Sequence, residues 1–160
     1  MVNALEPALY WLPMSVSPMM RYTYEIAGDD FGSAGAASSD IKKKLRQLGL
    51  PARLIKRTAI AMYEAEINMV IHAGGGVTDV HIDSRRIVME FRDEGPGIGD
   101  IELAMTEGWS TASEEARQMG FGAGMGLPNI KRNVDDLHIL SEPGGGTTVR
   151  MTLDIAGESP

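Results

Sequence analysis

Glu64, Asn68 and His72 recur at four-residue spacing inside an otherwise apolar stretch of the chain. On a helix, four residues turn through about 400°, so each of these side chains is displaced by only about 40° from the one before. A carboxylate on such a stripe can accept a proton, and a neutral amide oxygen is a ligand that Mg²⁺ accepts. The stripe is therefore a candidate for general-base and metal chemistry. An ordinary solvated helix face would have the same spacing.

A second motif, Asp-Glu-Gly-Pro-Gly over residues 93–97, follows a predicted strand directly. Asp93 at the end of a strand can accept a hydrogen bond from an exocyclic amine. Gly95 and Gly97 would let the backbone approach a flat base closely. A surface turn is the alternative, because Asp-x-Gly and Pro-Gly are both common in turns.

Four glycines alternate with other residues over 120–126, immediately before a predicted helix. Exposed backbone N–H groups and a helix amino terminus together favour phosphate, so this segment is a candidate phosphate cradle. It has neither the Gly-Lys-Ser/Thr of a P-loop nor the spacing of a dinucleotide fold. The polar segment 109–119 before it is typical of a lid, and a disordered loop is the alternative. Thr147 follows the glycines at 144–146, where a hairpin turn is the simple interpretation and a phosphate contact the other.

A small set of elements has to position these residues. Alternating and β-branched patterns predict strands over 21–27, 77–83, 86–92, 137–141 and 147–154. Apolar spacing predicts helices over 41–48, 52–73, 101–105 and 127–134, with Ser38, Ser39 or Asp40 as the cap of the first and Pro51 opening the second. This order predicts an α+β two-layer sandwich, with helices on one face of a mixed, mostly antiparallel sheet.

The composition predicts one domain of ordinary core size, over residues 21–155, after a loose amino-terminal arm over 1–20. The chain has 160 residues, of which 43% are hydrophobic, and no cysteine, so disulfides and thiolate metal sites are excluded. A net charge of −7 argues against nucleic acid as a partner, since phosphate binding needs a basic surface. No apolar run approaches the roughly 20 residues of a membrane span, and residues 1–20 do not resemble a secretory signal. We therefore expect no membrane partner and a cytoplasmic location.

Taken in order, the motifs E-x-x-x-N, D-x-G-x-G, a glycine-rich lid and G-T resemble those of the GHKL ATP-binding superfamily, which contains gyrase, Hsp90, histidine kinases and MutL. The resemblance covers residues 21–153. Within it, GFGAGMGLPNIKR and the closing SEPGGGTTVRM are most similar to the small serine/threonine kinases of bacterial partner-switching systems. These are the anti-sigma-factor type and the stressosome switch-kinase type.

The resemblance implies the Bergerat fold, ATP and Mg²⁺ as cofactors, and a role for each matching residue. Glu64 would be the catalytic base and Asn68 the Mg²⁺ ligand. Asp93 would bind the adenine amino group. The remaining cofactor-binding residues would be Gly95 and Gly97 around the base, Gly122, Gly124, Gly126 and Leu127 around the phosphates, and Thr147 on the adenine side. His72 stays outside the catalytic set.

The function that this resemblance implies is an ATP-dependent serine/threonine protein kinase. Its substrate would be a STAS-domain regulatory protein, and it would control a sigma-factor or stress-signalling partner switch. A sigma factor or another regulator is the further partner implied, and members of the family often form homodimers. The alternative is a nucleotide-gated anti-sigma or STAS-binding module with little or no catalysis. An ATPase without a protein acceptor is a third hypothesis.

Overall fold

A five-stranded sheet forms one layer of the computed structural model, which describes residues 19–156. The strands are β1 (Met20–Ala27), β2 (Gly75–Ile82), β3 (Arg86–Asp93), β4 (Asp136–Ser141) and β5 (Thr147–Asp154), and they lie in the order β1-β2-β3-β5-β4. Each strand starts and ends within two residues of its predicted bounds. All four pairings are antiparallel, so the sheet is antiparallel throughout the described strands rather than mixed. The predicted arm lies outside the described residues, except for Met19 and for Met20, which begins β1.

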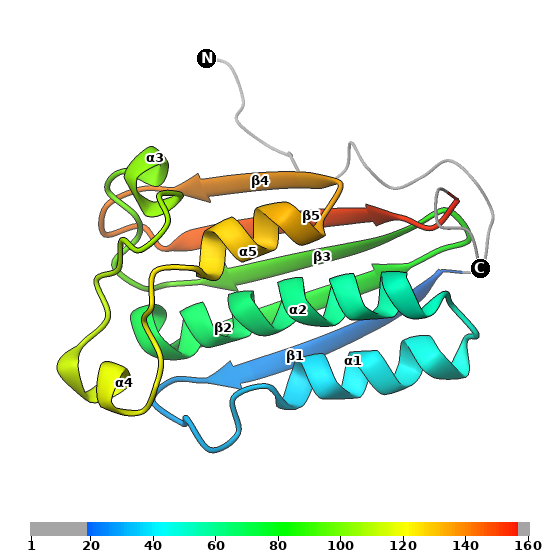
Figure 1. Ribbon diagram of the computed structural model, residues 1–160, viewed down its shortest axis with the longest axis horizontal. Helices are drawn as coiled ribbons and strands as arrows, with labels where there is room; N and C mark the ends of the chain where they lie inside the picture. The colour runs from blue at the N-terminus through cyan, green and yellow to red at the C-terminus, as the bar shows by residue number, and fades with distance from the viewer. Residues whose placement is uncertain (1–18, 157–160) are drawn as a thin grey trace, which may run out of the picture.

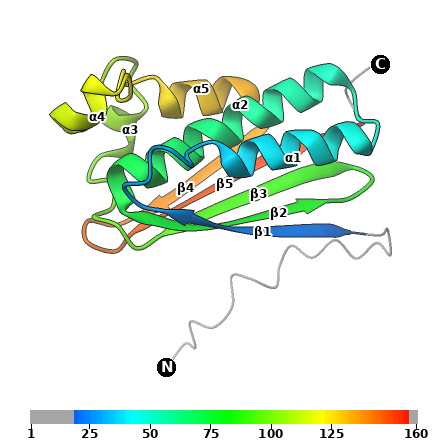
Figure 2. The ribbon, with the colours of Figure 1, turned by 90° about the horizontal axis from the view of Figure 1, so that it is seen from below.

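The second layer consists of helices on one face of the sheet. The helical elements are α1 (Ala36–Gln47), α2 (Ala52–Asn68), η1 (Met69–Ala73), α3 (Ile101–Ala104), α4 (Glu114–Gln118) and α5 (Gly126–Asn133). Figures 1 and 2 show α1, α2 and α5 across this face, and α3 and α4 at one end of the molecule. The α+β two-layer prediction is therefore confirmed. α4 was not predicted, because the segment 108–126 has the glycine-rich composition of a loop.

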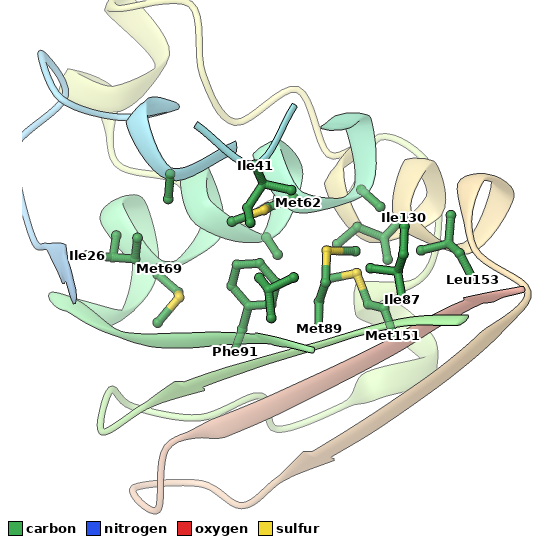
Figure 3. Close-up of a cluster of buried hydrophobic side chains, with 14 of the residues drawn as sticks. Ile26, Ile41, Met62, Met69, Ile87, Met89, Phe91, Ile130, Met151 and Leu153 are labelled. Atoms are coloured by element: carbon green, nitrogen blue, oxygen red, sulfur yellow. The ribbon is translucent and has the colours of Figure 1, made fainter. Parts of the chain in front are cut away.

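The core lies between the two layers and follows from the period-2 pattern of the central strands. Ile87, Met89 and Phe91 occupy alternate positions of β3, and all three point toward the helices (Figure 3). β5 contributes Met151 and Leu153 beside them, both fully buried. Burial of such side chains contributes roughly 1.5–3 kcal/mol each, which fixes the register of the strands that carry the site.

α1 begins five residues before its predicted start, and a carboxylate far away in the sequence explains the difference. None of the predicted caps is used, and Gly35 occupies the N-cap position with no side-chain cap. Instead the buried carboxylate of Glu66, on α2, accepts hydrogen bonds from the backbone N–H groups of Gly35 (2.9 Å), Ala37 (3.2 Å) and Ser38 (3.1 Å). The negative charge also favours a helix amino terminus, so α2 stabilises the start of α1.

The predicted helix over 52–73 exists along its whole length but changes its pitch at Asn68. The last turn, η1, has π-helical hydrogen bonding, and Gly74 ends it in the left-handed conformation (φ 70°). Gly28 lies against this end, because a Cβ on it would sit 2.2 Å from the carbonyl carbon of Gly74. Single π turns interrupt helices mostly at functional sites, and this one directly follows Asn68.

Asp79 is a buried carboxylate on the face of the sheet that the helices leave uncovered, with 3% of its surface exposed. It accepts hydrogen bonds from Thr23 (2.6 Å), Arg92 (2.6 Å) and Arg21 (3.1 Å). Burial raises the pKa of Asp79, but these hydrogen bonds outweigh it and lower that pKa to about 2. The network therefore stabilises the fold only while Asp79 is ionised.

We expect the free energy of unfolding to fall by about 2 kcal/mol on account of Asp79 as the pH drops from about 5 to about 2. The folded pKa lies below the unfolded value of 3.8, so the stabilisation is present above that value and is lost as the pH falls toward 2. Urea unfolding at a series of pH values measures this slope, which should be shallower in Asp79→Asn. The control is Glu25→Gln, because Glu25 is an exposed carboxylate of β1 on the same face of the sheet as Asp79. Equal slopes for the wild type and Asp79→Asn would contradict the assignment.

Candidate active site

A cavity of about 800 Å³ opens between the end of α2, the end of β3 and the glycine-rich segment before α5. This volume lies within the range of small-molecule sites. Figures 1 and 2 show the segment with α4 projecting from the end of the molecule at which α2 ends. The predicted site residues that line the cavity are Glu64, Asn68, Asp93, Gly97, Gly122, Gly124, Gly126, Leu127 and Thr147. His72 lines it as well, whereas Gly95 does not.

Glu64 and Asn68 lie against the first turn of α5. The Oε1 atom of Glu64 accepts a hydrogen bond of 2.8 Å from the side-chain amide of Asn129. A Cβ on Gly126 would lie 3.1 Å from Asn68 Oδ1 and 3.5 Å from Glu64 Oε2, so the backbone of α5 approaches both side chains closely. The carboxylate and the amide are both half-buried, which places them at the wall of the cavity rather than in open water.

The donor set around Asn68 suits a magnesium ion only if a nucleotide completes it. Within residues 19–156, no group of three or more His, Cys, Asp or Glu side chains could hold a metal ion. Mg²⁺ commonly keeps several water molecules and is bound through one or two protein oxygens together with substrate phosphates. The Oδ1 atom of Asn68 beside the cavity fits that second arrangement. A metal cage made of protein alone does not occur in this part of the chain.

Asp93 is held by one of its two carboxylate oxygens. Its Oδ1 atom accepts hydrogen bonds from the backbone N–H groups of Gly95 (2.9 Å) and Thr147 (3.1 Å). Among the described residues no donor contacts Oδ2, so this oxygen is left to accept a hydrogen bond from a ligand. Ser141 links Thr147 to the segment that follows the Asp93 turn. Its hydroxyl lies 2.8 Å from that of Thr147 and accepts a hydrogen bond of 2.7 Å from the Ile98 N–H.

The two glycines of the Asp93 turn serve the packing of the turn. Gly97 has a φ of 74°, and a Cβ on it would lie 2.0 Å from the carbonyl oxygen of Glu142. Gly95 packs against the end of η1, where a Cβ would lie 2.6 Å from the Cα atom of Ala73. Gly95 therefore fixes the turn against the helix and does not itself line the cavity, and its contact with the base stays a prediction.

The glycine-rich segment has defined contacts, which argue against the disordered-loop alternative. The N–H of Gly108 donates to the carbonyl of Gly124 (2.9 Å), and a Cβ on Gly124 would lie 2.4 Å from Gly108. Ser113 caps α4 by accepting from the N–H of Ala116. The Phe121 ring stacks on that of Phe31, from the β1–α1 loop, with 5.5 Å between centroids. The segment is thus closed on itself and tied to a distant loop.

His72 lies between the wall of the cavity and the lid. Its Nδ1 atom is 3.4 Å from the hydroxyl oxygen of Thr111. Burial lowers the pKa of His72, so the neutral form is favoured near neutral pH. A neutral ring suits a hydrogen bond to the lid, and the geometry gives it no contact with Glu64 or Asn68 that would add it to the catalytic set.

Sequence reasoning missed Asn129, Ser141 and Phe31. Asn129 had a usable signal, because it is a polar residue set among the buried Leu127, Pro128 and Ile130 of a predicted helix. Such a position predicts an inward-facing amide that needs a partner. Ser141 and Phe31 had no comparable signal, because their partners are reached only through strand register and through the lid.

The fold is a two-layer α+β sandwich with a cavity of small-molecule size, and comparison with known proteins identifies the family. Residues 55–157 match the family described as histidine kinase-, DNA gyrase B-, and HSP90-like ATPase, and the chain therefore belongs to it. The predicted GHKL membership is confirmed, and the family implies ATP binding. None of the helices in residues 19–156 is long and apolar enough to cross a membrane.

Two curated relatives each match more than half of the chain. The chain is 39% identical over 103 residues to an anti-sigma F factor of Thermoanaerobacter sp. (strain X514), covering 61% of this chain and 68% of the relative. It is 32% identical over 111 residues to the serine/threonine-protein kinase RsbT of Bacillus subtilis (strain 168), covering 66% of this chain and 76% of that kinase. The chain is thus related to an anti-sigma factor and to a serine/threonine-protein kinase.

Two solved structures share the fold at low sequence identity. The first holds the RsbU and RsbW domains of a Mycobacterium tuberculosis protein, with a TM-score of 0.54 and 16% identity, covering 86% of this chain and 32% of that one. The second is the mycobacterial sensor histidine kinase MprB, with a TM-score of 0.50 and 16% identity, covering 84% and 97%. At this identity the likeness shows the fold alone.

Proposed function

We propose that this chain is an ATP-dependent serine/threonine protein kinase whose substrate is a STAS-domain regulatory protein. The observation that carries the proposal is the position of Glu64: a carboxylate at the cavity wall, beside Asn68 and the glycine-rich lid, with one oxygen hydrogen-bonded and the other facing Gly126. The names of the relatives, an anti-sigma F factor and the kinase RsbT, support the partner-switching class.

The proposed reaction transfers the γ-phosphoryl group of ATP to an acceptor hydroxyl. A bond forms between the acceptor oxygen and the γ-phosphorus, and the bond from that phosphorus to the bridging oxygen breaks, so that ADP leaves. Glu64 accepts the hydroxyl proton through Oε2. Positioning and electrostatic stabilisation account for most of the rate enhancement in this class of reaction.

The other site residues would bind and orient the nucleotide. Asp93 would accept from the adenine amino group, with Thr147 and the Gly97 turn shaping that end of the cavity. Gly122, Gly124, Gly126 and Leu127 would surround the phosphates, with the amino terminus of α5 contributing N–H groups. Asn68 would hold Mg²⁺, which when bound neutralises charge on the phosphate oxygens.

A nucleotide-gated binding module with little catalysis is the second candidate, because one set of relatives is named for sigma-factor antagonism. In that case ATP would close the lid and shift the population that binds a sigma factor or a STAS protein. The stacking of Phe31 on Phe121 supplies a contact through which lid closure could reach the surface.

Transfer of label from γ-labelled ATP to a candidate STAS protein tests the proposal directly. We expect the label on a serine or threonine of that protein, dependent on Mg²⁺ and on this chain. Co-purification of native partners with Mg·ATP compared with Mg·ADP identifies which proteins to offer. Nucleotide-dependent binding without transfer would favour the binding module instead, and steady phosphate release with no partner present would favour an ATPase.

A further inference from the structure

We infer that Asn129 is a positioning residue, which holds Glu64 in the orientation needed for phosphoryl transfer and ties it to the helix that follows the lid. The inference rests on the proposed function, because it concerns the same base. It adds a residue that none of the motifs above contains, together with a physical link between the lid and the reacting atoms.

The first step is the geometry of the contact. The Nδ2 atom of Asn129 lies 2.8 Å from Glu64 Oε1, although 65 positions separate the two residues in the chain. An ionised carboxylate only accepts hydrogen bonds, so the NH₂ group of the amide must face it. Hydrogen bonds to a charged acceptor are about twice as strong as neutral ones, which makes this contact a strong restraint on the carboxylate.

The second step is that the anchor is itself fixed. The N–H of Asn129 donates to the carbonyl of Met125 (2.8 Å), and its own carbonyl accepts from the Asn133 side chain (2.8 Å). The neighbouring Ile130 is fully buried against the core. The backbone of Asn129 is therefore fixed, so its short side chain can place the amide only within a small region beside Glu64. The amide determines where the carboxylate of Glu64 rests.

The third step concerns which oxygen is left for chemistry. A glutamate side chain has several rotatable bonds, and a restraint on Oε1 leaves Oε2 as the oxygen that can accept a proton. Oε2 lies 3.5 Å from the position of a Cβ on Gly126, which also lines the cavity at the start of α5. A misplacement of about 1 Å can cost about 100-fold in rate, so this restraint is large enough to matter.

The fourth step is the link to the lid. The glycine-rich segment ends where α5 begins, at Gly126, and Asn129 lies within the first turn of that helix. A change in the lid that shifts the start of α5 would shift the amide and with it Glu64. The hydrogen bond thus makes the orientation of the base depend on the placement of α5.

A double-mutant cycle on ATP consumption tests the inference in the full-length chain, using Glu64→Ala, Asn129→Ala and the double variant. We expect Asn129→Ala to lower the rate by about 10- to 100-fold, with the dissociation constant for ATP changed by less than about threefold. We expect the double variant to consume ATP at the same rate as Glu64→Ala, because a residue that acts only through Glu64 has nothing left to position.

Lys131→Ala is the matched control, since it removes an exposed side chain from the same helix that does not line the cavity. It should retain at least half of the wild-type rate. Three results would overturn the inference: Asn129→Ala at the wild-type rate, a double variant slower than Glu64→Ala by the full factor of Asn129→Ala, or a weakened ATP affinity that accounts for the loss.

Failure of the kinase proposal can be distinguished from failure of the inference about Asn129. The assay measures ATP consumption whether the phosphoryl group goes to a protein or to water. A chain that only hydrolyses ATP would therefore refute the kinase proposal, but the double-mutant cycle would still test the role of Asn129. A wild-type chain that consumes no ATP either alone or together with its co-purified partners overturns the base assignment and the inference together.

Discussion

Replacing Glu64 with glutamine should slow phosphoryl transfer to the protein acceptor by about 100- to 10,000-fold, while ATP binding changes by less than about threefold. Glutamine keeps the length of the side chain and an oxygen that can accept from Asn129, so the cavity wall should be preserved. The NH₂ group that replaces Oε2 cannot take the proton from the hydroxyl of the protein substrate. The loss should therefore fall on the chemical step and not on affinity.

Single-turnover transfer from γ-labelled ATP measures the rate, and a calorimetric titration measures the dissociation constant. Glu94→Gln is the control, because Glu94 is an exposed carboxylate in the turn next to Asp93 and does not line the cavity. It should transfer phosphate at the wild-type rate. If Glu64→Gln does so as well, Glu64 is not the base, and the nucleotide-gated binding module becomes the better account.

Most of the fold could be predicted from local patterns, because the elements are long enough for their periodicity to be diagnostic. β3 and β5 alternate over eight residues each, and their predicted bounds agree with the structure to within one residue. The start of α1 could not be predicted in this way. It depends on the carboxylate of Glu66, which lies some thirty positions further along the chain and is brought to α1 only when α2 packs beside it.

The candidate site divides along the same line. Glu64 and Asn68 could be placed on one stripe because helical geometry relates them locally, and the structure brings both to the cavity wall. Contacts that close the site could not be predicted, since Asn129 meets Glu64 and Phe31 meets Phe121 only through the tertiary fold. Gly95 has a further role that the turn motif does not reveal, because its lack of a side chain lets the turn pack against Ala73.

The lid and the base are joined more closely than the motifs suggest. α2 provides Glu64 and Asn68, α5 follows the lid, and these two helices pack directly against each other. Arg57 of α2 adds a second link at the far end of α5, donating to the carbonyl of Asn133 and pairing with Asp135. Both ends of α5 are therefore tied to α2, through Asn129 at its start and Arg57 at its end, and the glycine-rich segment reaches α5 through Gly122 and Gly124, which have positive φ angles.

Replacing Asp93 with asparagine should weaken ATP binding by about 100-fold. Oδ1 of Asp93 accepts two backbone hydrogen bonds, from Gly95 and Thr147, and the oxygen of an asparagine amide would take over both. Its NH₂ group would then occupy the place of Oδ2 and face the adenine amino group. Two donors would oppose each other in a desolvated site, and leaving buried polar groups unpaired costs about 1–3 kcal/mol for each group.

The same substitution should change which base is preferred, which separates recognition from a general loss of fold. An amide NH₂ at the place of Oδ2 can donate to a carbonyl oxygen, so a hypoxanthine nucleotide, which has a carbonyl where adenine has its amine, should lose much less affinity than ATP. Calorimetric titrations of the wild type and of Asp93→Asn measure the affinity for ATP and for ITP. The ratio of ATP affinity to ITP affinity should be at least tenfold lower in Asp93→Asn than in the wild type. Unchanged ATP affinity in Asp93→Asn would mean that the adenine ring binds elsewhere in the cavity. An equal loss for both nucleotides would mean that Asp93 only holds the turn between Gly95 and Thr147. Because Oδ1 of Asp93 is already held by the backbone, Oδ2 is the oxygen that would contact the nucleotide. We therefore expect the preference to shift from ATP toward ITP, since only a direct contact reverses when an acceptor is exchanged for a donor.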